Sequence, residues 1–438
     1  MKGTRIAAVL LLALVLVAIA LAGCGGDDGT ATPSSAASPG GSGTVTLWHG
    51  YTDVERTATD AFALKYNATG PAWEVKAVFS GNNDYGLQKL LTALAAGKAP
   101  DMMYQYGSSL ANLSRSPKIV TIGDLIAQSP DFDWEDFYEA ERLACTVDGE
   151  VKALPALVDN LALVYNKALF DKAGVAYPTA DWTWDDFRSA AKELTDPATK
   201  QYGWAYVNDG SEDTVWRYLA VLWQAGGDLL NADNTQAAFN SPAGVASMTL
   251  LQDMAVNDES VYLDNGNGNY LNLFNAGKIA MLWTGPWDIS SINTEVQYGV
   301  EILAAGSAGH ATIAGPDDYV MIDNGADEVQ GSWAFLQWFT SPEVHLQYAI
   351  ATGHLPIRES ETTLPAYQDY LAKYPYAKVF VDNLKNVTKA RPNISQYPKI
   401  SMALGQAVQG VLLGKLQPQE ALDQASQQID TILAAPAP

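Results

Sequence analysis

Cysteine and histidine are scarce in this chain of 438 residues, which contains two cysteines and four histidines. Cys24 and Cys145 are too few for a disulfide framework or a cysteine-based zinc cluster. The histidines do not have the spacing of metal ligands; they are His49, His310, His345 and His354. We therefore expect no metal centre and no other bound cofactor.

Basic residues are also few, since 26 Lys and Arg stand against 49 Asp and Glu and give a net charge of -23. Such a surface repels phosphate backbones, which excludes nucleic acid as a partner. Only 17% of the residues are charged and 48% are apolar, a composition typical of folded rather than disordered chains. Because the length exceeds that of one ordinary hydrophobic core, we predict two globular domains.

After residue 22 the chain contains no run of apolar residues that is close to long enough to span a membrane as a helix. Ile6 to Ala22 is one uninterrupted run of Ile, Ala, Val and Leu behind two basic residues, which is the pattern of a secretory signal. The run is at the short limit for a bilayer core of about 30 Å, so a permanent transmembrane helix is the weaker interpretation.

This run ends in Leu21-Ala22-Gly23-Cys24, which resembles the lipobox of bacterial lipoproteins, where a peptidase cuts before the cysteine and acyl chains are attached to it. We expect residues 1–23 to be a lipoprotein signal peptide and Cys24 to be lipidated and to anchor the protein in the membrane. An ordinary secretory signal with an incidental cysteine is the alternative. Residues 24–43 are expected to form a flexible tether with a reach of roughly 25 Å, because small and polar residues dominate them.

Strand and helix patterns alternate along the rest of the chain. Residues 44–49 and 73–79 alternate apolar and polar side chains, and between them Thr52-Asp53-Val54-Glu55 has the spacing of a capping box before a helical stripe that reaches Lys65. This alternation favours a largely parallel sheet with helices on both faces. Further strands are predicted at 101–106, 151–156, 161–166, 278–283 and 297–303, and further helices at 83–97, 183–194, 213–225, 242–257, 327–350, 376–387, 396–413 and 418–432.

Three groups of segments, in a fixed order, carry a family resemblance. They are Val45-Thr-Leu-Trp-His-Gly-Tyr51 with Ala95-Ala-Gly-Lys-Ala-Pro-Asp101, then Leu154 to Lys167, then Phe274 to Trp287 followed by Tyr298-Gly-Val300 and Thr352-Gly-His-Leu-Pro356. With the lipobox in front, this set resembles the family 1 extracellular solute-binding proteins of ABC importers, typified by maltose-binding and glycerol-phosphate-binding proteins. The resemblance covers nearly the whole chain after the signal peptide.

The resemblance implies an α/β fold of the type II periplasmic-binding-protein kind, with two lobes joined by three hinge crossings. The N-terminal lobe would comprise residues 44–157 and 318–385, and the C-terminal lobe residues 158–314 and 390–432. The solute would be bound between the lobes.

The resemblance also implies a substrate-binding lipoprotein that captures a mono- or oligosaccharide, similar to maltose or maltodextrin, for an ABC importer and is not an enzyme. The expected partners are the carbohydrate ligand, the permease subunits of the importer and, through the lipid anchor, the membrane. The chain is expected to be a monomer and extracytoplasmic, on the periplasmic side or outer surface of the cell membrane.

Aromatic side chains are the first candidates for the site, because sugars present apolar C–H faces that pack on flat rings. The resemblance places Trp287 at the sugar-stacking tryptophan of a Gly-Pro-Trp motif, and Trp216, eleven residues before Gly227, at a second platform. Trp283, Tyr51 and Tyr104 are further candidates for ligand binding. About half of a wider aromatic set, which adds Trp48, Tyr106 and Trp223, is expected to fill cores instead.

Polar candidates surround these rings. Asp159 matches a carboxylate in the first crossing of the family, where it would accept two sugar hydroxyls or, alternatively, only cap a hinge. Arg391 lies near the third crossing, where it would bind a hydroxyl or a phosphate, or brace the lobes. Gln105 and Asp84 are expected in loops at the edge of the first-lobe cleft, with turn formation as the alternative role.

Two other functions stay open at this point. Ser401 to Gly405 contains no tryptophan where maltose-binding proteins have a stacking one, so the ligand could instead be glycerol 3-phosphate or another small polyol, which would make Arg391 indispensable. A surface glycoside hydrolase is the alternative from another class, because its two acids could be sought among pairs such as Asp185 and Asp186 or Asp317 and Asp318. The first of these pairs begins a predicted helix, where the helix dipole already accounts for it.

Overall fold

The computed structural model describes residues 41–435 apart from Thr52 and Asn82. The predicted signal peptide, the lipidation at Cys24 and nearly all of the predicted tether lie outside the described residues, as does the first residue of the predicted capping box. Within the described part, no helix is long and apolar enough to cross a membrane.

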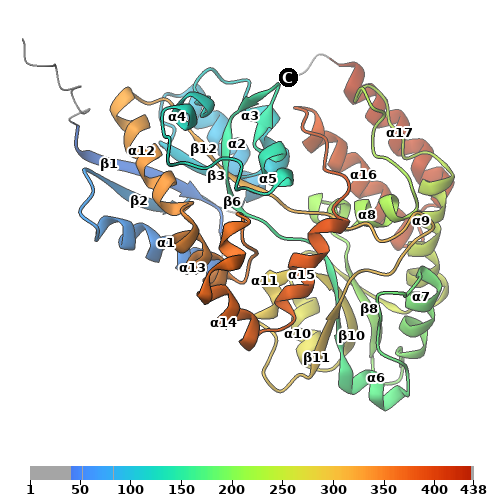
Figure 1. Cartoon of the computed structure of the whole chain (residues 1–438). Helices are drawn as coiled ribbons and strands as arrows, with labels where there is room; N and C mark the ends of the chain where they lie inside the picture. The colour runs from blue at the N-terminus through green and yellow to red at the C-terminus, as the bar shows by residue number, and fades with distance from the viewer. Residues whose placement is uncertain (1–40, 52, 82, 436–438) are drawn as a thin grey trace, which may run out of the picture. The chain divides into compact units, whose positions relative to one another are not determined.

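Two five-stranded sheets form the framework of the described residues 41–435 (Figure 1). The first sheet contains, in spatial order, β2 (Trp73–Phe79), β1 (Gly43–His49), β3 (Met102–Tyr106), β12 (Asp317–Met321) and β6 (Ala153–Leu157). The second contains β11 (Tyr298–Glu301), β7 (Ala162–Asn166), β10 (Ile279–Thr284), β8 (Tyr202–Val207) and β9 (Val261–Asp264). A small ladder pairs β4 (Thr146–Val147) with β5 (Glu150–Val151).

Each sheet has four strands in one direction and one reversed strand, which is β12 in the first sheet and β7 in the second. The predicted α/β class with two lobes and largely parallel sheets is confirmed. The reversed strands follow the two segments that pass from one sheet to the other, residues 158–161 and 302–316, and this origin explains their direction.

Helices cover both faces of each sheet (Figure 1). Those packed on the first sheet are α1 (Asp53–Asn67), α2 (Asn83–Ala95), α3 (Leu110–Leu113), α4 (Gly123–Ala127), α5 (Glu139–Ala144), α12 (Ala326–Phe339) and α13 (Pro342–Thr352). Those of the second sheet are α6 (Lys167–Ala173), α7 (Trp184–Glu193), α8 (Glu212–Gln224), α9 (Pro242–Gln252), α10 (Asn269–Asn275), α11 (Pro286–Ile289), α16 (Tyr397–Leu412) and α17 (Pro418–Ala434). Helices α14 (Pro365–Lys373) and α15 (Ala377–Asn383) join the two groups. Four short helical turns complete the list: η1 (Gly107–Ser109), η2 (Asp253–Asn257), η3 (Ser360–Thr363) and η4 (Leu384–Asn386).

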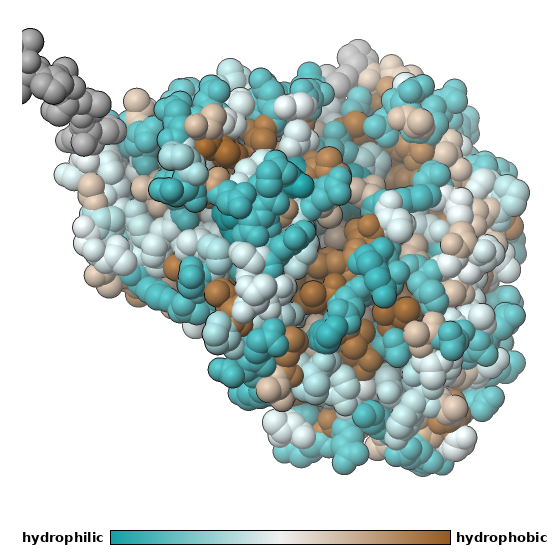
Figure 2. All heavy atoms as spheres, viewed as in Figure 1, coloured by the Kyte–Doolittle hydropathy of each residue, from teal (hydrophilic) through white to brown (hydrophobic). Residues whose placement is uncertain are grey.

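Successive strand residues supply the cores on opposite faces of each sheet, as the period of a strand requires. In β3, Tyr104 belongs to the core under α1, α12 and α13, whereas Met103 belongs to the core under α2 and α3. In β10, Trp283 packs beneath α7 and α8 and Leu282 packs on the opposite face. Most of the surface seen in Figure 2 is hydrophilic, and apolar residues gather near its middle.

Two local differences from the predicted elements have a clear cause. The predicted helix 327–350 is two helices, because Pro342 cannot continue a helix and instead occupies the first turn of α13. Strand β8 was not predicted, because its residues are buried on both faces and show no alternation. By contrast, the predicted cap at Thr183 is present as a full capping box with Asp186.

The connecting segments lie side by side. The Gly315 amide donates to the Asp159 carbonyl at 3.1 Å, and the Thr312 hydroxyl donates to the Leu161 carbonyl at 2.7 Å, so the first two passages are bonded to each other. Near the third passage, the Asn393 side chain donates to Thr146 of the first lobe at 3.1 Å. The residue limits assigned to the lobes stay predictions.

Candidate functional site

A cavity of about 430 Å³ lies where the strands of both sheets end. Its lining segments follow the carboxyl ends of β1, β3 and β6 in the first sheet and of β8, β9 and β10 in the second. Open α/β sheets place ligand sites at this edge. The lining residues are Gly50, Tyr51, Glu55, Tyr104, Tyr106, Leu157, Asp159, Asp209, Ser211, Glu212, Asp213, Trp216, Gly266, Trp287, Gly315, Asp317, His354 and Arg391.

The two indoles lie together on the side of the second sheet. Trp216 on α8 and Trp287 on α11 have ring centroids 5.7 Å apart with the planes tilted by 49°. The Trp216 Nε1–H donates to the Ala314 carbonyl at 3.3 Å, which holds that ring against the second passage. A Cβ at Gly285 would stand 1.8 Å from the Trp287 ring, so this indole can fold back only over a glycine. The rings therefore form a fixed apolar platform.

Tyrosines line the opposite side. The Tyr51 and Tyr104 ring centroids are 4.0 Å apart, and Tyr106 lies one strand repeat beyond Tyr104. The Tyr104 hydroxyl donates to the carboxylate of Asp317, the first residue of β12. Burial, together with the neighbouring Asp159, raises the pKa of Asp317 well above its ordinary value.

Asp159 enters the cavity from the passage between β6 and β7. Only 9% of this residue is exposed, and its Oδ1 atom has no hydrogen-bond partner among the described residues. Burial raises the pKa of Asp159 to about 7, against the opposing effects of Arg391 and the Gly315 amide. A Cβ at position 315 would lie 2.4 Å from Oδ1, so Gly315 leaves the space in which this oxygen sits.

Arg391 is bound to Glu212 of α8 rather than free in the cavity. Its Nη1 atom donates to Glu212 Oε1 at 2.9 Å, and Glu212 also accepts hydrogen bonds from the hydroxyls of Tyr397 and Ser401. Burial alone would lower the pKa of Arg391, but the Glu212 carboxylate raises it above its ordinary value. The guanidinium therefore stays charged and paired.

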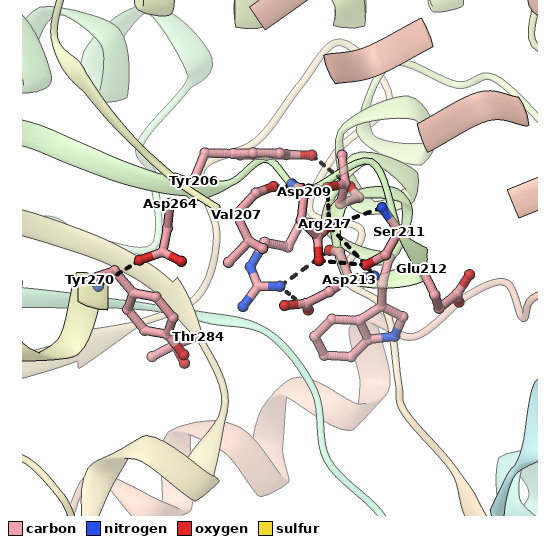
Figure 3. Close-up of polar contacts among 12 residues, drawn as sticks. Tyr206, Val207, Asp209, Ser211, Glu212, Asp213, Arg217, Asp264, Tyr270 and Thr284 are labelled. Atoms are coloured by element: carbon pink, nitrogen blue, oxygen red, sulfur yellow. Dashed lines mark hydrogen bonds and ion pairs between the residues drawn. The ribbon is translucent and has the colours of Figure 1, made fainter. Parts of the chain in front are cut away.

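The loop after β8 adds a rigid acidic rim, shown in Figure 3. Asp209 accepts hydrogen bonds from the Ser211 amide at 2.9 Å, from the Ser211 hydroxyl at 2.7 Å and from the Thr214 hydroxyl at 2.9 Å. Asp213 accepts from the buried Arg217 one turn along α8. These contacts fix the carboxylates before any ligand arrives.

His354 completes the wall beside the first passage. It is buried, and the next residue, Leu355, donates its amide to the Val158 carbonyl at 3.1 Å. Burial lowers the pKa of His354 to about 4, so the imidazole is neutral at pH 7. Its Nδ1 atom has no hydrogen-bond partner among the residues described.

The structure brings six of the nine predicted ligand residues to the cavity: Trp287, Trp216, Asp159, Arg391, Tyr51 and Tyr104. Trp283 lies instead in the core of the second lobe, 2% exposed and stacked on Phe187 at 5.2 Å. Gln105 lies in β3 rather than in a loop, on the face opposite Tyr104. Asp84 belongs to α2 rather than to a loop, and its side chain lies outside what the structure describes.

Sequence reasoning missed most of the acidic rim. Asp209, Ser211 and Glu212 follow a strand that was not predicted, although the Asp-Gly-Ser sequence before a helix was a signal for such a turn. Asp317 was noted only as a pair with Asp318, yet the two point to opposite faces of β12, where Asp318 accepts from the buried Cys145 thiol at 3.2 Å. In the described chain, no group of three or more His, Cys, Asp or Glu is arranged to hold a metal ion.

Comparison with known proteins gives a consistent result. The sequence profile of the bacterial extracellular solute-binding proteins matches residues 51–345. The chain is 24% identical over 413 residues to the sn-glycerol-3-phosphate-binding periplasmic protein UgpB of Escherichia coli O1:K1, and the match covers 89% of this chain and 92% of that protein.

Solved structures with the same fold include two saccharide-binding proteins. The cyclic alpha-maltosyl-1,6-maltose binding protein of Arthrobacter globiformis is 27% identical with a TM-score of 0.77, covering 90% of this chain and 99% of that one. The ABC substrate-binding protein Lmo0181 of Listeria monocytogenes, solved in complex with cycloalternan, is 26% identical with a TM-score of 0.80, covering 89% and 98% of the two chains.

Proposed function

The chain belongs to the bacterial extracellular solute-binding proteins, and from this premise we propose that it is the substrate-binding lipoprotein of an ABC importer that captures a mono- or oligosaccharide. Binding of a sugar between the lobes would stabilise one arrangement of the lobes, which the permease could distinguish from the empty one. The lipidated Cys24 would hold the protein at the outer side of the cell membrane. The similar proteins that bind cyclic saccharides support the carbohydrate assignment.

The observation that carries this proposal is the pairing of an indole platform with buried carboxyl groups in one cavity. A sugar ring would stack its C–H face on Trp287 and Trp216. Its hydroxyls would donate to Asp159 and Asp317, since carboxyl oxygens are strong acceptors in a buried site. Tyr51 and Tyr104 would close the other side. We propose these six residues as the main ligand contacts.

A phosphorylated polyol such as glycerol 3-phosphate is the second candidate solute, supported by the similarity to UgpB. The environment of Arg391 weighs against it, because the guanidinium already pairs with Glu212 at 2.9 Å. A phosphate would have to displace that carboxylate and approach other acidic side chains. The sugar therefore fits the cavity better than the phosphate does.

Isothermal titration calorimetry with the purified soluble domain tests the proposal. The panel should contain glucose, maltose, maltotriose, a cyclic glucan and glycerol 3-phosphate. We expect at least one saccharide to bind with a 1:1 stoichiometry. Binding of glycerol 3-phosphate alone would overturn the carbohydrate assignment in favour of the second candidate.

The proposal also holds that the protein binds its sugar without cleaving it. Prolonged incubation with the tightest oligosaccharide should release no new reducing ends. Steady release that is lost in Asp159→Asn would instead identify a glycoside hydrolase. Labelling of whole cells with a palmitate analogue should mark the wild-type protein and not Cys24→Ala, and unlabelled wild type would contradict the lipid anchor.

A further inference from the structure

Charge in the cavity is strongly one-sided among the described residues. Six carboxyl side chains line it, against one guanidinium and one neutral imidazole. The carboxyl groups are those of Glu55, Asp159, Asp209, Glu212, Asp213 and Asp317. A solute that brought only hydroxyl groups would add no positive charge among these carboxyl groups.

Cations within the protein balance only part of this charge. Arg391 pairs with Glu212, and Arg217 pairs with Asp213. Asp209 is held by the Ser211 and Thr214 hydroxyls, and Asp317 by a tyrosine hydroxyl, so their partners are neutral donors. Asp209 and Asp317 are thus fixed in place by neutral donors and form no ion pair among the described residues.

Asp159 goes further, because its Oδ1 atom has no partner at all among the described residues while 9% of the residue is exposed. Gly315 leaves room for this oxygen, since a Cβ there would lie 2.4 Å from it, and the Asp159 residue lines the cavity. The Asp159 charge is near enough to Asp317 to raise the pKa of Asp317. A buried carboxylate without a partner is costly, and a cation beside it removes much of that cost. A positive group of a ligand would therefore be favoured beside the Asp159 carboxyl group.

We propose, on the basis of the saccharide function above, that the solute is an amine-bearing saccharide whose protonated amine binds at Asp159. Its sugar ring would stack on Trp287 and Trp216, and its ammonium group would donate to the Asp159 carboxyl group and face Asp317. The faces of the two indoles also attract cations, which adds to the same preference. A phosphorylated saccharide would be repelled by the same carboxyl groups.

Calorimetry with matched saccharides tests this assignment at pH 7.5 and low ionic strength. The first set is maltotriose, an amino-deoxy maltotriose in which one hydroxyl is replaced by an amine, and a maltotriose phosphate. The second pair is the glucosamine trisaccharide and its N-acetylated form. In at least one of the two sets we expect the amine to bind about tenfold or more tightly than the neutral saccharide, and any phosphate to bind more weakly than both.

Two variants locate the effect. Asp159→Asn keeps the shape of the side chain and removes its charge. Neutral saccharide binding should weaken, because a strong hydroxyl acceptor is lost, and the affinity ratio of amine to neutral saccharide should fall to near one. Asp369→Asn removes an exposed carboxylate on α14 and should leave the ratio unchanged. Added salt should reduce the ratio in the wild type.

The outcomes separate the two levels of the argument. If no saccharide of either set or of the earlier panel binds, the proposed function fails and this inference fails with it. If neutral saccharides bind and the amine gives no advantage, or if the advantage survives Asp159→Asn, the inference alone is overturned.

Discussion

The two walls of the cavity differ, although the sheets behind them share one plan of four strands in one direction and one reversed. The wall of the first lobe contains tyrosines, a carboxyl group held by a phenol and the Glu55 carboxyl group. The wall of the second lobe carries two indoles and carboxylates paired with arginines. The same strand ends thus provide a phenol-rich hydrogen-bonding surface on one side and a stacking surface with ion pairs on the other.

Because the walls differ, we expect them to have different roles in ligand binding. The second-lobe wall is fixed by ion pairs within that lobe, so it is ready to receive a flat ring without rearrangement. The first-lobe wall offers groups that donate and accept hydrogen bonds around the ring. We expect substitutions in the ion pairs to change stability first, and substitutions in the platform to change affinity first.

The largest effect is expected for Arg391→Met. The substitution leaves Glu212 partly buried without its cation, so the free energy of unfolding should fall by about 3 kcal/mol, as measured by urea denaturation. The double variant Arg391→Met/Glu212→Gln should recover most of this loss, because no unpaired charge remains. Unchanged stability together with abolished binding in Arg391→Met would show that the guanidinium serves the ligand instead.

Trp287→Ala should weaken saccharide binding by about 1 to 3 kcal/mol, because a stacking surface is lost. The free energy of unfolding should change by less than about 1 kcal/mol, since the side chain is only partly buried. Trp283→Ala is the matched control, four residues earlier in the same segment, and should lower stability by about 3 kcal/mol or more. Calorimetry and thermal melts on both variants check this assignment. A loss of stability in Trp287→Ala together with a loss of affinity in Trp283→Ala would contradict it.

Asp159 makes stability depend on pH, because its pKa is raised in the folded protein to about 7 and is ordinary in the unfolded chain. The stability that is linked to the raised pKa of Asp159 is fully present below about pH 4. It is lost as the pH rises through 7. Asp159→Asn should therefore be more stable than the wild type at pH 8, by on the order of 2 kcal/mol, with a smaller difference at pH 5. A difference that stays constant from pH 5 to pH 8 would contradict the shift. The charged groups that act on or with Asp159 are Arg391, Arg217, Asp213, Asp317 and Glu141.

The smallest effect is expected for Tyr104→Phe in the first-lobe wall. Asp317 would lose the hydroxyl that donates to it, which should lower stability by about 1 kcal/mol. Tyr374→Phe, on a half-buried tyrosine outside the cavity, should change it by less than about 0.5 kcal/mol. Equal losses in the two variants would show that the Tyr104 hydroxyl has no special role.

Much of the fold follows from local sequence patterns. The alternating residues of β1 and β2 and the capping box at Thr183 predicted elements that the structure contains. Strand β8 could not be read in this way, because tertiary packing buries both of its faces and removes the alternation. The cavity residues that follow β8, which are Asp209, Ser211 and Glu212, were therefore not predicted either.

The site was predictable only in part for a similar reason. Trp283 and Trp287 are four residues apart in one motif, but the turn from β10 into α11 sends one ring into the core and the other to the cavity. Gln105 is adjacent to Tyr104, and the alternation of β3 places them on opposite faces. Composition and spacing indicate which residues are candidates for the site. The direction in which each side chain points depends on the assembled sheet and cannot be predicted from them.

A crystal structure of the chain with the saccharide that binds most tightly in calorimetry tests the central claim most directly. We expect the sugar in the cavity between the two lobes, with a ring packed on Trp287 and a polar group within hydrogen-bond distance of Asp159. A sugar bound elsewhere, or one that contacts a single wall only, would contradict the account.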